Sequence, residues 1–156
     1  MPEFSSKYVQ VHIATYDSNR DDYSYLVMQR SDDIEVYPSL WQVITGTINP
    51  DETALEAAIR EVWEETGIKT DKIWTLPYIA QFYNPKSDLI HLSPVFGIII
   101  DSTQDVRLSD EHQKYEWLKF YDCIDRLVLP AHKDGTRIFW EYVISQTEKE
   151  MFSMNI

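Results

Sequence analysis

Apolar and polar residues alternate along several short stretches of this chain, and such alternation is typical of β-strands with one buried face. The clearest case is residues 8–16, where Val9, Val11 and Ile13 point to the same side. Residues 23–30 predict a second strand, which we expect to pair with the first. Further strands are predicted over residues 40–44, 73–83, 89–100 and 115–120, with the 73–83 and 89–100 strands forming a hairpin.

A different spacing, close to 3.6 residues, follows residue 53 and indicates an amphipathic helix. Apolar residues share its inner face: Ala54, Leu55, Ala58 and Val62. Thr53 and Glu56 have the pattern of a capping box, in which each side chain binds the backbone N–H of the other residue. Gly67 supplies the left-handed residue that commonly ends a helix. We therefore expect a helix over residues 54–66.

Apolar patterns nearer the C-terminus predict two more helices, over residues 121–128 and 136–151. Strands on both sides of a central helix, with a long helix at the end, favour an α/β fold, built as a sandwich around a mixed sheet. A chain of 156 residues without a visible linker or internal repeat is expected to form a single domain over residues 1–156.

Composition narrows the partners that this domain can have. The chain carries 26 acidic and 14 basic residues, a net charge of −12, so it repels the phosphate backbone of nucleic acids. A small phosphorylated ligand would meet the same repulsion unless cations accompany it. The single cysteine, Cys123, excludes an internal disulfide, and no apolar run approaches about 18 residues. We expect a cytoplasmic protein that binds neither nucleic acid nor a membrane.

Three glutamates lie on one arc of the 54–66 helix, beside its apolar face: Glu61, Glu64 and Glu65. Like charges at this spacing repel each other and destabilise the helix. An acidic, solvated helix face is the ordinary explanation of such a cluster. The alternative is a site for a hard divalent cation, because Mg²⁺ and Mn²⁺ bind carboxylate oxygens and would turn the repulsion into coordination. The adjacent Arg60, with Glu52 in the preceding loop, favours the cation site.

The segment Gly46–Ile68 resembles the Nudix box. That motif is a glycine, five residues, a glutamate, seven residues and then Arg-Glu-aliphatic-any-Glu-Glu-any-Gly-aliphatic. Every fixed position is filled here, by Gly46, Glu52, Arg60, Glu61, Val62, Glu64, Glu65, Gly67 and Ile68. The match covers only 23 of the 156 residues, but its spacing is very specific. The resemblance implies a Nudix-type α/β/α sandwich with a mixed β-sheet and the hydrolysis of phosphoanhydride bonds.

The Nudix resemblance also implies a role for each residue of the motif. Glu61 and Glu65 would be the principal ligands of Mg²⁺, or of Mn²⁺ in its place, and Glu64 would assist them. Arg60 would orient Glu61, so the implied catalytic residues are Glu61, Glu64 and Arg60. The identity of the general base differs among members of the family and stays open. Other residues of the motif would be structural: Gly46, Glu52, which pairs with Arg60, and Gly67.

A second resemblance, to bacterial dihydroneopterin triphosphate pyrophosphatases, covers more of the chain and is less specific. It rests on the segments VMQRSDD, WQVITGTINPDET and SDEHQKYEWL. It implies that Glu111 joins the metal site, although the adjacent Asp110 is an equal candidate by residue type. It also implies that Lys7, Arg30 and Thr45 contact the substrate. The ordinary alternatives are a surface ion pair for Arg30 and a solvated charge for Lys7.

The sequence thus supports the hypothesis of a Mg²⁺-dependent hydrolase that splits a nucleoside or pterin triphosphate into a monophosphate and pyrophosphate. Dihydroneopterin triphosphate and (d)NTPs are the expected substrates. One alternative is a hydrolase of another nucleoside diphosphate-linked substrate, such as ADP-ribose or a dinucleoside polyphosphate. The other is a non-catalytic, nucleotide-binding Nudix module. The sequence leaves open whether the protein is a monomer or a homodimer, which phosphorus is attacked and how many metal ions bind.

Overall fold

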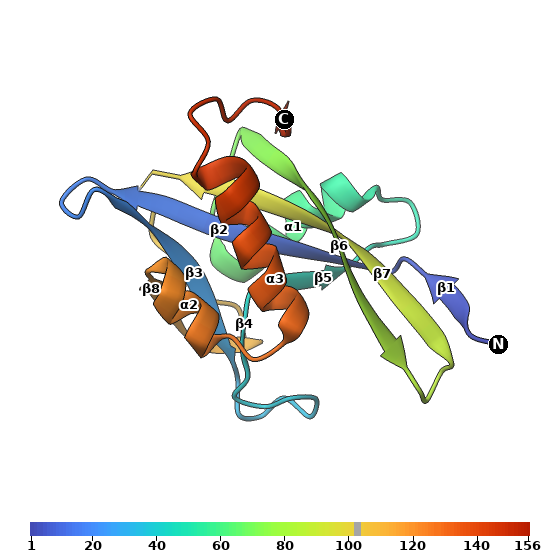
Figure 1. Cartoon of the computed structure of the whole chain (residues 1–156). Helices are drawn as coiled ribbons and strands as arrows, with labels where there is room; N and C mark the ends of the chain where they lie inside the picture. The colour runs from blue at the N-terminus through green and yellow to red at the C-terminus, as the bar shows by residue number, and fades with distance from the viewer. Residues whose placement is uncertain (102–103) are drawn as a thin grey trace.

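The computed structural model describes residues 1–101 and 104–156, and its strands join one mixed sheet (Figure 1). The strands are β1 (Glu3–Ser5), β2 (Tyr8–Asp17), β3 (Asp22–Arg30), β4 (Trp41–Gln42), β5 (Ile44–Thr47), β6 (Lys72–Asn84), β7 (Leu89–Ile100), β8 (His112–Leu118) and β9 (Ser153–Asn155). The helices are α1 (Ala54–Thr66), α2 (Phe120–Arg126) and α3 (Pro130–Phe139), which continues into a π-helical turn, η1 (Trp140–Ile144).

The middle of the sheet consists of β2 and β7, which run parallel to each other. β3 pairs antiparallel with β2, and β6 pairs antiparallel with β7. The predicted pairing of the first two long strands and the predicted hairpin after the central helix are therefore confirmed. The register of the hairpin shifts between Thr75 and Ile79, around Pro77, because proline has no N–H to donate to the ladder.

Helices cover both faces of this sheet. In Figure 1, α1 lies behind the sheet, whereas α2 and α3 lie in front of it. Each side has its own apolar core. These layers are those of an α/β/α sandwich with a mixed sheet, so the predicted fold class is confirmed. None of the described helices is both long and apolar enough to cross a membrane.

β2 is buried on both faces, unlike the half-buried strand that its alternating pattern predicted. The apolar face packs under α1, as expected. Gln10 and His12 point to the opposite face and are also buried, because α3 covers them. Gln10 Nε2 donates to His12 Nε2 at 2.8 Å and to the carbonyl of Ala131 at 3.0 Å. A central position in the sheet thus buries polar residues that the pattern alone assigned to solvent.

The central helix α1 has the predicted bounds, Ala54–Thr66. Thr53 Oγ1 accepts from the N–H of Glu56 at 3.2 Å, and the Glu56 carboxylate accepts from the N–H of Thr53 at 2.8 Å. The predicted capping box is therefore present. Gly67 ends the helix with a φ of 69°, in the left-handed region where a side chain would be strained.

Several predicted elements have different bounds in the structure, including the strand predicted over residues 115–120, which is β8 at His112–Leu118. The strand predicted over residues 40–44 is divided into β4 and β5, which pair with β3 and β2 respectively. The helix predicted over residues 136–151 is wrong at both ends, because α3 begins at Pro130 and helical structure stops at Ile144. Proline needs no N–H partner in the first helical turn, so it favours a start that apolar spacing did not reveal. The three-residue strands β1 and β9 were not predicted.

Two buried imidazoles, His12 on β2 and His132 on α3, give the fold a defined response to pH. Burial, helped by the nearby His132, lowers the pKa of His12 to about 3, and burial lowers the pKa of His132 to about 4. In the unfolded chain both return to a pKa of about 6.5. Below that pH the unfolded chain binds protons that the folded protein does not. The free energy of unfolding therefore falls as the pH drops from about 6.5 toward 4.

We predict that His12→Gln removes one group from this proton linkage while keeping a polar side chain between Gln10 and Thr136. The difference in unfolding free energy between wild type and variant should change by up to about 1.4 kcal/mol per pH unit below about pH 6.5. Urea unfolding at several values between about pH 7 and pH 5 measures this difference. Parallel profiles for the two proteins would show that His12 does not contribute.

Candidate functional site

The side chain of Arg60 joins the loop before α1 to the carboxylates on that helix. Its Nε and Nη2 donate to both carboxylate oxygens of Glu52, at 2.7 and 2.8 Å, in a bidentate pair. Its Nη1 donates to Glu61 Oε1 at 2.7 Å and to Glu64 Oε2 at 3.1 Å, and Nη2 also reaches the carbonyl of Thr47 at 2.8 Å. The expected contacts of Arg60 with Glu52 and Glu61 are thus present, and Arg60 offsets part of the repulsion among the carboxylates.

Gly46 leaves the space that the Glu61 side chain occupies. β5 holds Gly46 opposite Val9 of β2, and Glu61 packs directly on the glycine. A Cβ at this position would lie 2.1 Å from Glu61 Cγ and 2.2 Å from its Cδ, distances at which one group must move. The glycine is therefore required by a close approach of side chain to backbone, and any larger residue would displace the Glu61 carboxylate.

Glu65 is the most deeply buried of the carboxylates. Only 3% of its surface is exposed, and within the described part of the chain its Oε2 has no hydrogen-bond partner. Burial is the main cause that raises the pKa of Glu65 to about 9, and the charges of Glu111 and Glu61 raise it further, whereas Arg30 opposes them. Burial also raises the pKa of Glu61, against the effect of its bond to Arg60. A cation bound between Glu61 and Glu65 would stabilise both carboxylates in their ionised form, against the effects of burial and of repulsion.

The carboxylates of α1 face the turn before β8 across a cavity of about 270 Å³. Its lining residues are Glu61, Glu64, Glu65, Ser109, Asp110 and Glu111. Carboxylate oxygens from two elements fit a hard divalent cation, and the unpartnered Oε2 of Glu65 is available as a ligand. Glu111 and Asp110 both line the cavity, but it is the charge of Glu111 that raises the pKa of Glu65.

The side chains around this cavity do not yet form a closed cation shell. Among residues 1–101 and 104–156, no three carboxylate, imidazole or thiol groups converge closely enough to hold an ion. Arg60 Nη1 donates to one carboxylate oxygen of Glu61 and to one of Glu64, so these two oxygens are already partnered. Cation binding would therefore bring these carboxylates closer together, while Glu61 stays packed on Gly46.

A larger cavity of about 530 Å³ opens on the α3 side of the sheet. Aromatic residues among those lining it are Tyr8, Tyr37, Phe82 and Tyr83. Phe82 is 52% exposed, and its ring stacks at 4.6 Å on the buried ring of His91. A half-exposed ring held from behind in this way can stack on a heterocycle. Buried polar side chains that also line the cavity are Gln10, Gln42, Ser93 and His132.

Arg30 and Thr45 connect the larger cavity to the carboxylate cluster. Both residues line the larger cavity. Thr45 directly precedes Gly46, the glycine on which Glu61 packs. The positive charge of Arg30 acts to lower the pKa of Glu65. Arg30 Nε donates to the carbonyl of Val36 at 3.1 Å, which holds the guanidinium at this edge. The structure thus brings both predicted substrate residues beside the predicted metal ligands.

Lys7 is not brought to the site in the same way. It is exposed in the connection between β1 and β2, and neither of the two cavities has it among its described lining residues. Conversely, the sequence did not single out four other residues that line the larger cavity, Gln10, Gln42, Phe82 and His132. These come from four different elements, so no spacing along the chain marks them as a group.

The fixed residues of the box therefore surround one cavity, and the comparison with known families agrees with this geometry. A model of the NUDIX domain matches residues 8–138 of the chain. The chain belongs to the Nudix family. The match extends far beyond the box and includes the elements that contribute Arg30, Thr45 and Glu111.

Individual relatives resemble the chain over segments of different length. The asymmetrical bis(5'-nucleosyl)-tetraphosphatase of Mus musculus is 36% identical over 101 residues, which is 60% of this chain and 63% of that protein. The dihydroneopterin triphosphate diphosphatase of Haemophilus influenzae is 48% identical over 60 residues, 38% of this chain and 33% of that protein. The chain thus spans less than two thirds of either relative. The E. coli dihydroneopterin triphosphate pyrophosphohydrolase structure has the same fold, with a TM-score of 0.69 at 22% identity over 90% of this chain and 99% of that one.

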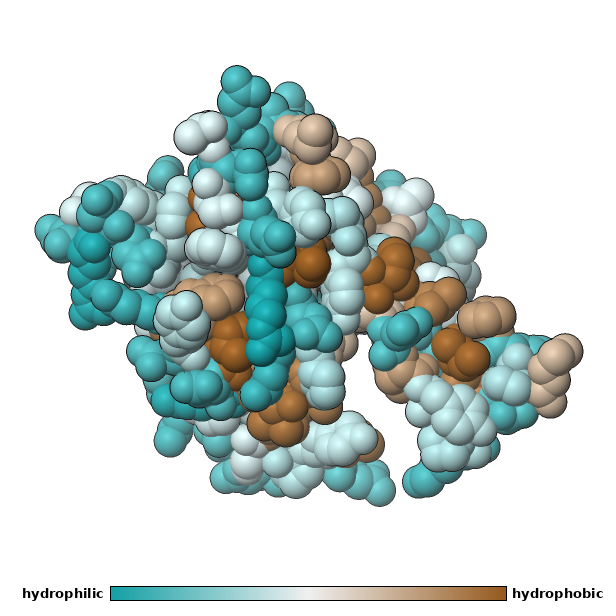
Figure 2. Space-filling view, viewed as in Figure 1, coloured by the Kyte–Doolittle hydropathy of each residue, from teal (hydrophilic) through white to brown (hydrophobic). Residues whose placement is uncertain are grey.

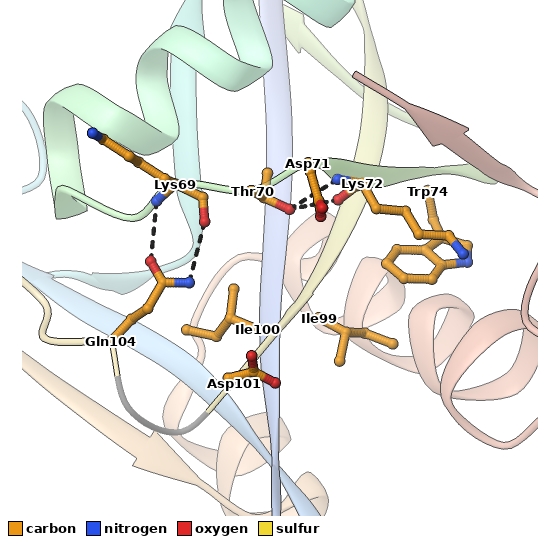
Figure 3. Close-up of a pocket in the computed structure, with 9 residues that line it drawn as sticks. All are labelled: Lys69, Thr70, Asp71, Lys72, Trp74, Ile99, Ile100, Asp101 and Gln104. Carbon is orange, nitrogen blue, oxygen red and sulfur yellow. Dashed lines mark hydrogen bonds between the residues drawn. The ribbon is translucent and has the colours of Figure 1, made fainter.

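Another hollow of this Nudix domain, also of about 530 Å³, lies beyond the C-terminal end of α1 (Figure 3). The Lys69 N–H donates to Gln104 Oε1, and Gln104 Nε2 donates to the Lys69 carbonyl, each at 3.1 Å. Lys72, on the same hollow, is paired with Glu150. The carboxylates of the Nudix box do not line it, so it lies apart from the candidate site.

We predict that Glu65→Gln stabilises the metal-free domain at alkaline pH. Because the pKa of Glu65 is raised from 4.5 to about 9, the folded protein keeps a proton that the unfolded chain loses, and this contribution to stability disappears as the pH rises toward 9. Glutamine has nearly the same shape and does not ionise. In EDTA at about pH 8, thermal melting should show a higher Tm for the variant, with roughly 2–4 °C for each kcal/mol regained.

The same melting curves with MgCl₂ or MnCl₂ test the cation site. A divalent cation should raise the Tm of the wild type, because it takes the place of the proton on Glu65. It should leave the Tm of Glu65→Gln nearly unchanged. Equal shifts in both proteins would contradict a role for Glu65 as a ligand.

Proposed function

We propose that this Nudix domain is a Mg²⁺-dependent pyrophosphohydrolase, with Mn²⁺ as the alternative cofactor. Its substrate would be a nucleoside or pterin triphosphate, and its products the monophosphate and pyrophosphate. The observation that carries the proposal is that Arg30 and Thr45 line the aromatic cavity, while Glu61 of the glutamate cavity packs on Gly46, the residue after Thr45. A heterocycle in the larger cavity would bring its phosphate chain to Arg30 and the glutamates.

The proposed cation ligands are Glu61, Glu64, Glu65 and Glu111. When bound, the cation supplies positive charge against the phosphoryl oxygens and lowers the pKa of a water molecule. The net charge of −12 makes such a cation necessary for any triphosphate to approach. A heterocycle in the larger cavity would lie beside residues of α3 and β6, and the carboxylates of α1 are not among the lining residues of that cavity.

The protein's own side chains would perform the remaining steps. Arg60 holds Glu61 by a charge-assisted hydrogen bond and keeps it over Gly46. Arg30 presents a planar guanidinium, which suits phosphate oxygens, and Thr45 lies beside it. The side chain of Glu64 is 55% exposed, so it is open to water and able to accept a proton from it.

A dinucleoside polyphosphate is the second candidate substrate. The 36% identity with the mouse tetraphosphatase favours it, whereas the 48% identity with the Haemophilus diphosphatase covers the shorter segment. The larger cavity favours the triphosphate, because its described lining suits one heterocycle beside the glutamates and a dinucleotide carries two. A non-catalytic nucleotide-binding module is the weakest candidate, since every glutamate of the box is retained.

A substrate panel with a matched control tests this proposal. Pyrophosphate release would be measured with dihydroneopterin triphosphate, (d)NTPs and a diadenosine tetraphosphate, each with Mg²⁺ and with EDTA. We expect metal-dependent pyrophosphate release from at least one triphosphate, and none from Glu61→Gln. Cleavage of the diadenosine tetraphosphate alone, to a triphosphate and a monophosphate, would support the second candidate and refute the first.

We predict that Arg60→Lys lowers kcat by at least about tenfold, equivalent to about 1.4 kcal/mol in the activation barrier. Lysine cannot make the bidentate pair with Glu52 and still reach Glu61, because it lacks the planar fork. Circular dichroism would confirm that the variant is folded, and steady-state kinetics on the best substrate of the panel would give kcat. Turnover at the wild-type rate would refute a role for Arg60 in orienting Glu61.

A further inference from the structure

His112, the residue after Glu111, is buried and hydrogen-bonded to a residue that lines the larger cavity. His112 is the first residue of β8 and is 4% exposed. Gln42 Nε2 donates to His112 Nε2 at 2.8 Å, and Gln42 is itself 4% exposed and lines the larger cavity. The two residues are 70 apart in sequence and meet because β4 and β8 both pair with β3. Neither residue lines the carboxylate cavity.

The turn that carries Glu111 is fixed from both sides. Ser31 binds it twice, because its N–H donates to the carbonyl of Glu111 at 2.9 Å and its Oγ donates to the carbonyl of Asp110 at 2.8 Å. On the other side, the N–H of His112 donates to the carbonyl of Ser109 at 3.2 Å. The ladder between β3 and β8 is irregular at this point, between Gln29 and Arg30. The strand pairing therefore does not by itself fix the turn.

We infer that Gln42 and His112 are a positioning pair that holds Glu111 over the carboxylates of α1. The imidazole of His112 anchors the start of β8 in the interior, and the hydrogen bond from Gln42 fixes the rotation of that ring. Because Glu111 directly precedes His112, a shift of its backbone away from the cavity would strain this buried bond. The inference rests on the proposed function, since it assigns these residues to the proposed cation site.

A simple packing role for His112 would give a different result from a positioning role. His91 is a suitable control, because it is also 4% exposed and its Nδ1, like that of His112, has no partner among the described residues. It lies on β7, outside the lining of the carboxylate cavity. Loss of either imidazole is expected to reduce stability, but only loss of His112 should change the affinity for a cation.

The experiment is a titration of the full chain with Mn²⁺ alone, followed by electron paramagnetic resonance. His112→Phe should weaken Mn²⁺ binding by about tenfold, the lower end of effects seen for groups that orient metal ligands. His112→Gln, which can still bond to Gln42, should retain most of the affinity. His91→Phe should bind Mn²⁺ as the wild type does. If His112→Phe does not fold, Gln42→Met removes the same hydrogen bond and takes its place in the test.

A double-mutant cycle with Glu111→Gln separates positioning from general destabilisation. If His112 acts through Glu111, the double variant should bind Mn²⁺ no more weakly than Glu111→Gln alone. Additive losses, or wild-type Mn²⁺ affinity in folded His112→Phe, would overturn the inference. Because nucleotide is absent from this experiment, an inactive wild type that still binds Mn²⁺ would refute the proposed function and leave the positioning pair intact.

Discussion

Repulsion between carboxylates is the constraint on which the rest of this structure depends, and the guanidinium of Arg60 is the interaction that meets it. Glu61 and Glu64 project from adjacent turns of α1 and both bind Arg60. The same guanidinium makes a bidentate pair with Glu52 in the preceding loop. One side chain thus holds the helix, the loop and the carboxylates in a single arrangement, and the capping box at Thr53 fixes where that helix begins.

The sheet brings carboxylates to the cavity from two directions. Gly46 on β5 lets the Glu61 side chain lie against the backbone, and the turn before β8 brings Glu111 to the opposite side of the cavity. Glu65 is buried between them with a raised pKa, a state that costs stability whenever the group must ionise. The domain therefore keeps Glu65, a group that costs stability, within its candidate site. Groups with strongly shifted pKa values are common at functional sites.

The surface of the molecule is consistent with two separate binding regions, one for a cation and one for a heterocycle. Hydrophilic residues cover much of the face shown in Figure 2, and apolar residues also gather on the lobe that projects at the right, where Figure 1 places the β6–β7 hairpin and β1. Phe82 and Tyr83 belong to that hairpin and line the larger cavity. The strongly negative charge of the chain and this aromatic wall favour a ligand that is part heterocycle and part cation-bound phosphate.

Local patterns in the sequence predicted the elements whose ends are set by residues close together in the chain, such as α1. The bounds of α1 follow from Thr53, Glu56 and Gly67, because caps act within a few residues. The resemblance to the Nudix box likewise implied the contacts of Arg60 with Glu52 and Glu61, which lie within one loop and one helix. The start of α3 at Pro130 does not follow from apolar spacing, because proline favours the first helical turn through its fixed φ and missing N–H.

Contacts that depend on the topology of the sheet could not be predicted in this way. Gln42 and His112 meet only because two strands pair with β3, and Gln10 is buried only because α3 crosses β2. Glu111 was proposed from resemblance to a known group of proteins, not from any spacing within this chain. The structure adds the reason for its position, since the turn before β8 lies across the cavity from Glu65.

The most direct test of this account is to locate the cation itself. Crystals of the protein soaked in Mn²⁺ and measured at the manganese absorption edge would give an anomalous difference peak at each bound ion. The account predicts a peak within coordination distance, about 2.0–2.3 Å, of oxygens from Glu61, Glu65 and Glu111, with the Glu61 side chain still packed on Gly46. A folded, ordered site without a manganese peak among these carboxylates, at saturating Mn²⁺, would contradict it.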